Sequence, residues 1–217
     1  MKYYDLSDLP SGNCMWNRGA DQMKLIWIRH GQTKGNQEKR YIGRTEEALC
    51  PAGIAQIEAQ IRAGRYPKAD LVVCSPMKRC IQTADLIYPE VQKIQVEALR
   101  ECDFGRFEGK NYVELSADPA YQQWIDSSGT LPFPEGETVE GFQKRTREGF
   151  WMALQQIQAA GGQKSTVAFV VHGGTIMSVL SAYARPKQAY YAYQVQNGQG
   201  YETWWDGVEM RIRGKIV

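Results

Sequence analysis

The stretch Met23-Lys24-Leu25-Ile26-Trp27-Ile28-Arg29-His30-Gly31 indicates how the rest of the chain is organised. Its first six residues, apolar except for Lys24, form a short run of strand length, and charged and polar residues follow where such a strand would end. Two later segments repeat this arrangement. Residues 71–74 and residues 167–171 are each a short apolar run with polar residues directly behind it. The sequence therefore predicts buried strands whose C-terminal ends carry polar side chains.

Segments with helical patterns and turn signals separate these apolar runs. Four helices are predicted: over residues 51–63, from a Ser75 cap through residue 86 with Pro76 at the first position, from a Thr138 cap to Gly161-Gly162, and over residues 174–184. A strand is predicted over residues 93–99, and a hairpin over residues 201–213 around Asp206-Gly207. The stretch 106–136 is predicted to be rich in loops, with one short helix near residues 121–124. Alternating strands and helices predict an α/β protein with three layers, α/β/α, around a mostly parallel sheet.

The composition is that of an ordinary globular protein. Among 217 residues, 26 Lys and Arg stand against 24 Asp and Glu, and a net charge of +2 does not favour nucleic acid as the main partner. The longest clean apolar runs are four or five residues, whereas a membrane-spanning helix needs about 20. No secretory signal pattern is present at the N-terminus. We therefore expect a cytoplasmic protein that does not bind membranes.

Cysteines and histidines argue against disulfides and metal ligation. The five cysteines are odd in number and have no CxxC spacing, so reduced thiols are expected. The only two histidines, His30 and His172, have no cysteine or second histidine at ligand spacing. The sequence therefore predicts neither a metal site nor a need for a cofactor.

Residues 1–22 differ from the rest of the chain. They contain turn signals with little periodicity between them, and Met23 begins the first predicted strand. We therefore expect residues 1–22 to be a peripheral N-terminal extension and residues 23–217 to form one domain.

The polar residues at the predicted strand ends are suited to binding phosphate. His30 and His172 both follow a predicted strand. Arg29 directly precedes His30, and Arg79 lies just after the predicted strand over residues 71–74. Ligands bind outside the C-terminal ends of strands in such sheets. Guanidinium groups fit phosphoryl oxygens, and the amides of Gly173-Gly174 at a helix start could approach an oxyanion closely. One imidazole could then act as nucleophile and the other as a donor.

These residues lie in motifs that resemble the histidine phosphatase superfamily, which contains the cofactor-dependent phosphoglycerate mutases. The similarity extends over about residues 24–205, and its blocks occur in order: residues 25–33 followed by Asn36, residues 43–45 and 49–56, residues 75–84, residues 99–109, and residues 171–174. The resemblance implies a phosphoglycerate mutase-like fold, a histidine phosphatase domain over residues 23–217, and phosphomonoester hydrolysis through a phosphohistidine intermediate.

The resemblance also implies roles for individual residues. His30 would be the nucleophile, Glu101 the proton donor to the leaving alcohol, and His172 the third catalytic residue. The other implied site residues are Arg29, Asn36, Arg79 and Gly173 for the phosphate, and Gln32, Thr33, Gly43 and Thr45 for the remainder of the substrate. Phosphate oxygens near Glu101 would favour its protonated form, which agrees with an acid role.

Within the superfamily, the short stretch between Glu101 and His172 favours a phosphatase over a mutase. Residues 134–138 with Phe142 and Arg145 are similar to small bacterial phosphatases, and the most similar are alpha-ribazole phosphatases of cobalamin biosynthesis. The expected partner is a small phosphomonoester, and the sequence leaves the oligomeric state open. A cofactor-dependent phosphoglycerate mutase is the first alternative.

An alternative of another class is a non-catalytic protein of the same fold that binds a phosphate ligand. Such a protein would be expected to lose one of His30, Arg79, Glu101 or His172, and none is lost. Two other phosphate chemistries are excluded. A cysteine-based phosphatase would need an arginine six positions after Cys74, where Cys80 stands, and no P-loop motif occurs.

Overall fold

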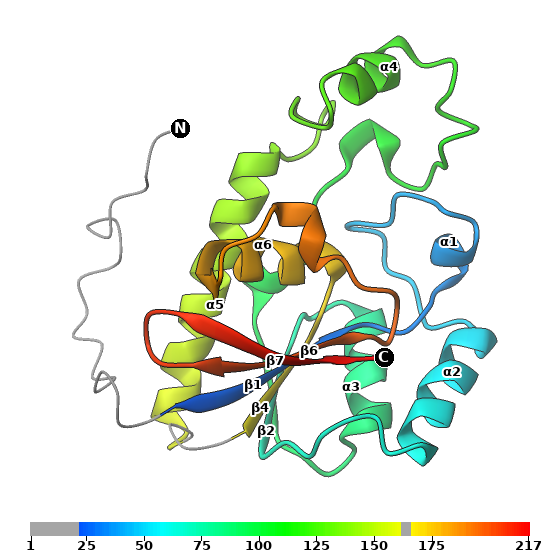
Figure 1. Cartoon of the computed structure of the whole chain (residues 1–217). Coiled ribbons are helices and arrows are strands. Elements are labelled where there is room, and N and C mark those ends of the chain that lie inside the picture. Colours follow the sequence, from blue (N-terminus) through cyan, green and yellow to red (C-terminus); the bar gives the residue numbers. More distant parts are fainter. Residues whose placement is uncertain (1–21, 162–165) are drawn as a thin grey trace.

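The computed structural model describes residues 22–161 and 166–217 (Figure 1). The predicted N-terminal extension, apart from Gln22, lies outside the described residues. The predicted domain boundary at residue 23 therefore stays a prediction.

A seven-stranded sheet forms the centre of the molecule, in the order β3-β2-β4-β1-β6-β7-β5. The strands are β1 (Met23–Arg29), β2 (Leu71–Cys74), β3 (Lys93–Gln95), β4 (Thr166–Val171), β5 (Ala184–Arg185), β6 (Gly200–Trp205) and β7 (Met210–Ile216). Strands β1 to β4 pair in parallel, and β6 pairs antiparallel with both β1 and β7. The mostly parallel sheet and the predicted C-terminal hairpin are confirmed.

Helices cover both faces of this sheet (Figure 1). They are α1 (Lys34–Gln37), α2 (Pro51–Arg62), α3 (Lys78–Ile87), α4 (Pro119–Asp126), α5 (Val139–Ala159) and α6 (Gly173–Tyr183), with 3-10 helices η2 (Glu97–Leu99), η3 (Gly105–Phe107) and η4 (Tyr190–Tyr193). Side chains of β1 alternate between the two faces. Trp27 packs in the core with Phe150 of α5, whereas Ile28 packs in a second core with Ala84 of α3. This alternation produces the three predicted layers.

Several predicted helix ends are confirmed by their caps. Helix α2 begins at Pro51, and the Cys50 thiol accepts a hydrogen bond from the Gly53 amide. Thr138 caps α5 by accepting from the Gly141 amide. Gly161, which follows α5, has a positive φ of 75°, as expected for a glycine at a helix end. Its predicted companion Gly162 lies outside the described residues.

Three predictions near the site are wrong in detail. Helix α3 begins at Lys78 with Met77 as its N-cap, two residues after the predicted Ser75 cap, because the backbone of Met77 is still extended (φ −64°, ψ 136°). The Ser75 hydroxyl accepts from the Met77 amide at 3.4 Å and lies 2.8 Å from His172 Nε2. The strand predicted over residues 93–99 ends at Gln95. Its partner β2 ends at Cys74, so the chain then turns into η2. Helix α6 begins at Gly173, one residue earlier than predicted.

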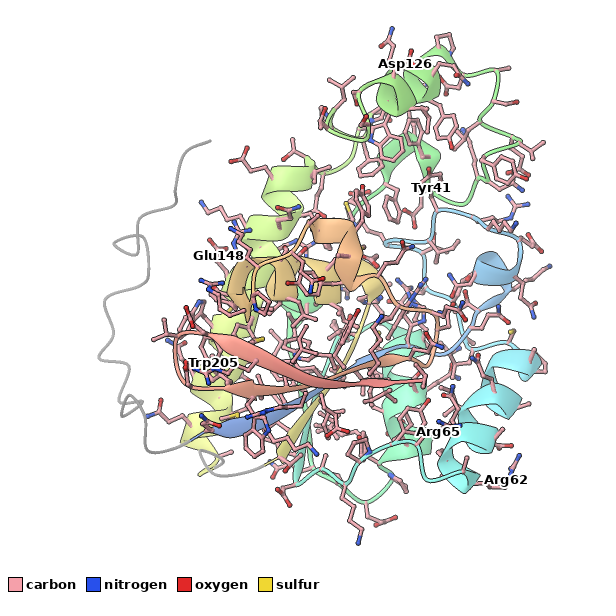
Figure 2. All side chains as sticks on the ribbon, viewed as in Figure 1. Tyr41, Arg62, Arg65, Asp126, Glu148 and Trp205 are labelled. Carbon is pink, nitrogen blue, oxygen red and sulfur yellow. The ribbon has the colours of Figure 1, made fainter. Side chains whose placement is uncertain are left out.

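The loop-rich stretch between η3 and α5 has a small core of its own. The predicted short helix is α4, which lies farther from the central sheet than α6 does (Figure 1). Its aromatic side chains pack mainly edge to face with Tyr41, which Figure 2 shows between the α1 and α4 segments. Tyr41 also exchanges backbone hydrogen bonds with Gly109 and Lys110. The excursion is thereby fixed to the loop that follows α1.

Candidate active site

The C-terminal ends of β1 and β4 bring the two histidines together. These strands are paired neighbours, with Arg29 opposite Val171, and the His30 amide donates to the Val171 carbonyl at 2.9 Å. The two imidazole rings therefore lie edge to face, with centroids 5.3 Å apart. Both side chains are buried.

The hydrogen bond of His30 defines which ring nitrogen is available. Nδ1 lies 2.7 Å from the Gly31 carbonyl oxygen, and because a carbonyl only accepts, Nδ1 carries the proton. Burial is the main cause that places the pKa of His30 well below its usual value, and the charges of Arg79 and Arg29 lower it further. His30 is therefore a neutral imidazole whose Nε2 has a free lone pair.

Two residues outside the predicted site fix the His30 segment. The Gly31 amide donates to Thr83 Oγ1 at 2.9 Å, and that hydroxyl donates to the Arg79 carbonyl at 2.7 Å. Asn197 Nδ2 donates to the His30 carbonyl at 3.0 Å and to Asn36 Oδ1 at 3.1 Å. Thr83 lies within the sequence block of residues 75–84, and only the fold shows that Thr83 and Asn197 meet at His30.

His172 is held from the side of β2 and α3. Its Nε2 lies 2.8 Å from Ser75 Oγ and 3.5 Å from the Cys80 thiol. Burial, followed by the charge of Arg79, places the pKa of His172 well below its usual value. Burial likewise raises the pKa of the Cys80 thiol, which therefore stays protonated. The four described cysteines are free and buried, and Cys14 lies outside the described residues.

Arg79 and Arg29 each have a buried Nε–H group that donates to no described residue. Arg79 is fully buried, and its Nη1 and Nη2 donate to the carbonyls of Thr45 and Gly43 at 2.9 and 2.8 Å. Arg29 Nη1 donates to the Val195 carbonyl at 2.8 Å. The Nε–H groups of both arginines are buried without a partner among the described residues. Buried donors are normally satisfied, so these two point to a missing acceptor such as a phosphate.

The carboxyl group of Glu101 lies between η2 and the start of α6. Part of the side chain is open to solvent, but the carboxyl group is enclosed by protein, and this burial raises its pKa. The raising effect outweighs hydrogen bonds from the Cys102 and Gly174 amides and the charges of Arg79 and Arg29. Glu101 therefore holds a proton more readily than an ordinary glutamate.

Gly43 and Thr45 contribute through their backbone. Their carbonyls accept from Arg79, and their amides donate to Glu108 Oε1 at 2.8 and 2.9 Å. A Cβ at position 43 would lie 1.8 Å from the Cys102 carbonyl, so the close approach requires glycine. Glu108 was not among the predicted site residues, although it lies within the sequence block of residues 99–109.

The remaining predicted residues are placed around α1 and α6. Thr33 is buried and caps α1, and Asn36 Oδ1 accepts from the Thr33 amide and from Asn197. The Asn36 amide nitrogen is thereby directed away from these donors. Gln32 pairs with Gln37 on the exposed side of α1. Gly173 opens α6, where an added Cβ would lie 3.5 Å from Arg29 Nε.

Two properties of the described part of the chain bear on cofactors and membranes. Within residues 22–161 and 166–217, no group of three or more His, Cys, Asp or Glu residues could hold a metal ion. In the same ranges no helix combines the length and the apolar character needed to cross a bilayer.

Comparison with known proteins identifies the family. The model of the histidine phosphatase superfamily (branch 1) matches residues 25–214. The chain belongs to the histidine phosphatase superfamily. This membership confirms the resemblance seen in the sequence, and it supports a general phosphatase or mutase activity.

Relatives of this histidine phosphatase family member carry several names. A Hydrogenobacter thermophilus protein named "Putative phosphoserine phosphatase 2" is 30% identical over 162 residues, which are 72% of this chain and 76% of that protein. The adenosylcobalamin/alpha-ribazole phosphatase of Escherichia coli is 30% identical over 183 residues, 81% of this chain and 87% of that protein.

A solved structure confirms the fold. The alpha-ribazole phosphatase of Shigella flexneri superposes with a TM-score of 0.77 at 23% sequence identity, covering 90% of this chain and 96% of that chain. The predicted phosphoglycerate mutase-like α/β fold is thereby confirmed.

Proposed function

We propose that this protein hydrolyses small phosphomonoesters through a phosphohistidine formed on His30. The observation that carries the proposal is a neutral imidazole with a free Nε2, together with two arginines, Arg29 and Arg79, whose Nε–H groups are buried without a partner among the described residues. A phosphate dianion would satisfy Arg29 and Arg79 and present its phosphorus to the imidazole.

In the first step, the lone pair of His30 Nε2 forms a bond to phosphorus while the bond from phosphorus to the ester oxygen breaks. Protonated Glu101 gives its proton to the departing oxygen, so the product leaves as a neutral alcohol. His30 then carries the phosphoryl group and Glu101 is a carboxylate.

In the second step, water replaces the alcohol. The Glu101 carboxylate takes a proton from the water as its oxygen bonds to phosphorus, and the bond between phosphorus and Nε2 breaks. Inorganic phosphate leaves, and His30 and Glu101 return to their starting protonation states. No metal or cofactor enters either step, because the two arginines counter the charge of the phosphoryl group.

Other site residues would stabilise the transferring group. His172, with Ser75 on its Nε2, contributes an imidazole beside His30, and Asn36 directs its amide nitrogen away from Thr33. The Gly173 amide begins α6, where a helix N-terminus favours an anion. The part of the substrate beyond the phosphate is proposed to lie near Gln32, Thr33, Gly43 and Thr45. The backbone carbonyls of Gly43 and Thr45 also hold Arg79 in position.

The proposed substrate is alpha-ribazole 5'-phosphate, in cobalamin biosynthesis. This is supported by 30% identity to the adenosylcobalamin/alpha-ribazole phosphatase of E. coli over most of both chains. A cofactor-dependent phosphoglycerate mutase is the alternative within the family. It is disfavoured by the short stretch from Glu101 to His172, which leaves little room for insertions.

A screen of phosphomonoesters tests this proposal. The purified protein is incubated with alpha-ribazole 5'-phosphate, phosphoserine and 3-phosphoglycerate, and released phosphate and rearranged phosphoglycerate are both measured. We expect phosphate release, with the highest kcat/KM for alpha-ribazole 5'-phosphate. Isomerisation of phosphoglycerate without net hydrolysis would favour the mutase. Binding of phosphate without turnover of any ester would favour a non-catalytic phosphate-binding protein.

A further inference from the structure

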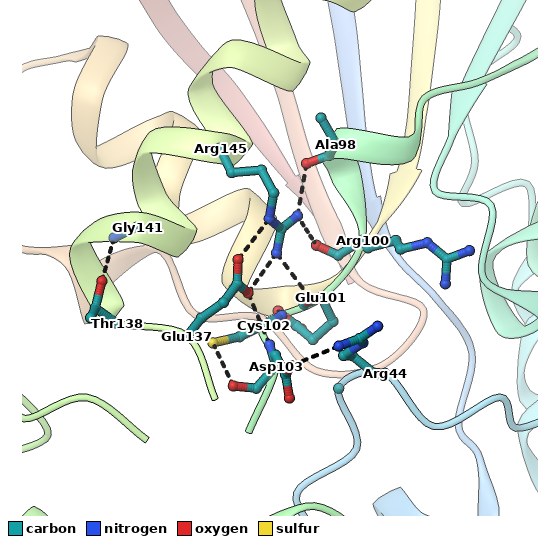
Figure 3. Close-up of polar contacts among 12 residues, drawn as sticks. Arg44, Ala98, Arg100, Glu101, Cys102, Asp103, Glu137, Thr138, Gly141 and Arg145 are labelled. Carbon is teal, nitrogen blue, oxygen red and sulfur yellow. Dashed lines mark hydrogen bonds and ion pairs between the residues drawn. The ribbon is translucent and has the colours of Figure 1, made fainter. Parts of the chain in front are cut away.

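The side chain of Arg145 points from α5 towards the segment that carries Glu101 (Figure 3). Its Nη1 donates to the carbonyls of Ala98 and Arg100, both at 3.0 Å, and its Nη2 donates to the Glu101 carbonyl at 3.2 Å. One side chain therefore binds three carbonyl groups in the turn that leads into Glu101. This turn has no strand partner to fix it, since β3 ends at Gln95.

Glu137 holds Arg145 in place. Arg145 Nε and Nη2 donate to the two carboxylate oxygens of Glu137 at 2.8 and 2.7 Å, which is the bidentate geometry of a strong ion pair. Glu137 Oε2 also accepts from the Asp103 amide at 2.9 Å, and the Glu137 amide donates to the Asp103 carbonyl at 2.9 Å. Glu137 thus fixes the chain after Glu101, while Arg145 fixes the chain before it.

Arg145 has no donor left for a substrate. A guanidinium has five N–H groups, and Arg145 uses them in five hydrogen bonds, two to Glu137 and three to backbone carbonyls. One face of its guanidinium also lies over the Phe142 ring, 5.3 Å from the ring centroid. An arginine with all its donors committed to protein is a poor phosphate ligand. Its contacts instead determine where the Glu101 main chain lies.

We propose that Arg145, held by Glu137, is a positioning residue that places the Glu101 carboxyl group for proton donation to the leaving group. This inference rests on the acid role of Glu101 in the proposed function. It assigns Arg145 to the leaving-group side of the reaction and leaves phosphate capture to Arg29 and Arg79.

The leaving group provides the test. Arg145→Met keeps much of the aliphatic stem and removes all five donors, and Lys144→Met on the exposed side of the same helix is the matched control. Each variant is assayed with an alkyl phosphate, whose leaving group needs a proton, and with p-nitrophenyl phosphate, whose leaving group does not. For Arg145→Met we expect kcat on the alkyl ester to fall ~10²-fold, with a much smaller loss on the aryl ester. Inhibition by inorganic phosphate should change little.

A double variant separates positioning from general damage. If Arg145 acts through Glu101, adding Arg145→Met to Glu101→Gln should cause no further loss on the alkyl ester. Equal losses on both esters, or losses that add in the double variant, would overturn the role of Arg145. If the methionine variant does not fold, Arg145→Lys is assayed in its place, because a lysine cannot donate to Glu137 and to all three carbonyls at once. It should show the same selective loss.

Failure of the underlying function has a different signature. If the wild-type protein hydrolyses neither ester, or if Glu101→Gln affects both esters equally, the acid role of Glu101 is wrong and the inference falls with it. If Glu101→Gln gives the selective loss but Arg145→Met does not, the proposed function stands and only the positioning role is overturned.

Discussion

Gly174 lies so close to Glu101 that a Cβ added to it would be 2.5 Å from the Glu101 Oε1 atom. The same Cβ would lie 2.9 Å from the Phe142 ring. Real Cβ atoms do not approach other atoms this closely, so a side chain at position 174 would require the Glu101 carboxyl group and the Phe142 ring to move. The Glu101 carboxyl group can therefore reach the first turn of α6, beside the two histidines.

This contact predicts the effect of Gly174→Ala. The added methyl group should displace the Glu101 carboxyl group and lower kcat on alkyl phosphates by ~10-fold or more, with a smaller loss on p-nitrophenyl phosphate. Steady-state kinetics on both esters measure the effect. Gly214→Ala is the control, because a Cβ there would meet no atom within 4 Å. Full activity of Gly174→Ala on alkyl esters would show that Glu101 does not need this position.

The raised pKa of Glu101 predicts how the rate depends on pH. Its protonated form is the active acid, so kcat for an alkyl phosphate should fall as pH rises through this pKa. His30 should not limit the rate at mildly acid pH, because its pKa lies well below the usual value. The profiles of the wild type and Glu101→Gln are compared on one substrate, so that ionisation of the ester is common to both. The account is contradicted if the alkaline fall persists in Glu101→Gln.

The two buried histidines predict a loss of stability in acid. Unfolded histidine binds a proton below about pH 6.5, whereas His30 and His172 stay neutral in the folded state. The free energy of unfolding should therefore fall as pH drops below that value, by up to ~1.4 kcal/mol per pH unit for each histidine. Urea denaturation between pH 7.5 and 5 measures this slope. His172→Asn should have a shallower slope than the wild type, and equal slopes would mean that His172 is protonated in the folded protein.

Glu108 is expected to support phosphate binding from a distance. Its Oε1 accepts from the amides of Gly43 and Thr45, and the carbonyls of these residues hold Arg79. Glu108→Ala leaves the two amides without this acceptor, and the inhibition constant for inorganic phosphate should rise ~10-fold. The exposed Glu90→Ala is the control. An unchanged inhibition constant in Glu108→Ala would show that the hydrogen bonds of Glu108 to Gly43 and Thr45 do not support phosphate binding.

The sequence could predict the part of the site that lies at strand ends. His30 and His172 each follow a short apolar run, and paired parallel strands must bring their C-terminal ends together. The starts of α2 at Pro51 and of α5 after Thr138 could also be predicted, because a helix cap depends on residues only a few positions away.

Contacts between distant, irregular segments could not be predicted in this way. The Ser75 hydroxyl bonds to His172, 97 residues away, a contact that the local sequence around Ser75 does not indicate. Glu108 and Arg145 act on loops that have no periodicity, and the loop groups that they bind are backbone amides and carbonyls, which carry no side-chain signature in the sequence. Only the folded chain shows which of them are bound.

His30 is proposed to carry the phosphoryl group, and trapping this intermediate on the chain provides a direct test. The protein is mixed briefly with a phosphomonoester labelled in its phosphate and quenched in alkali, where a phosphoramidate survives, and the labelled peptide is then identified. We predict label on the peptide that contains His30, and none in His30→Ala, which should also lack turnover. Label on His172 would exchange the roles of the two histidines, and label on a cysteine or a carboxylate would contradict the mechanism.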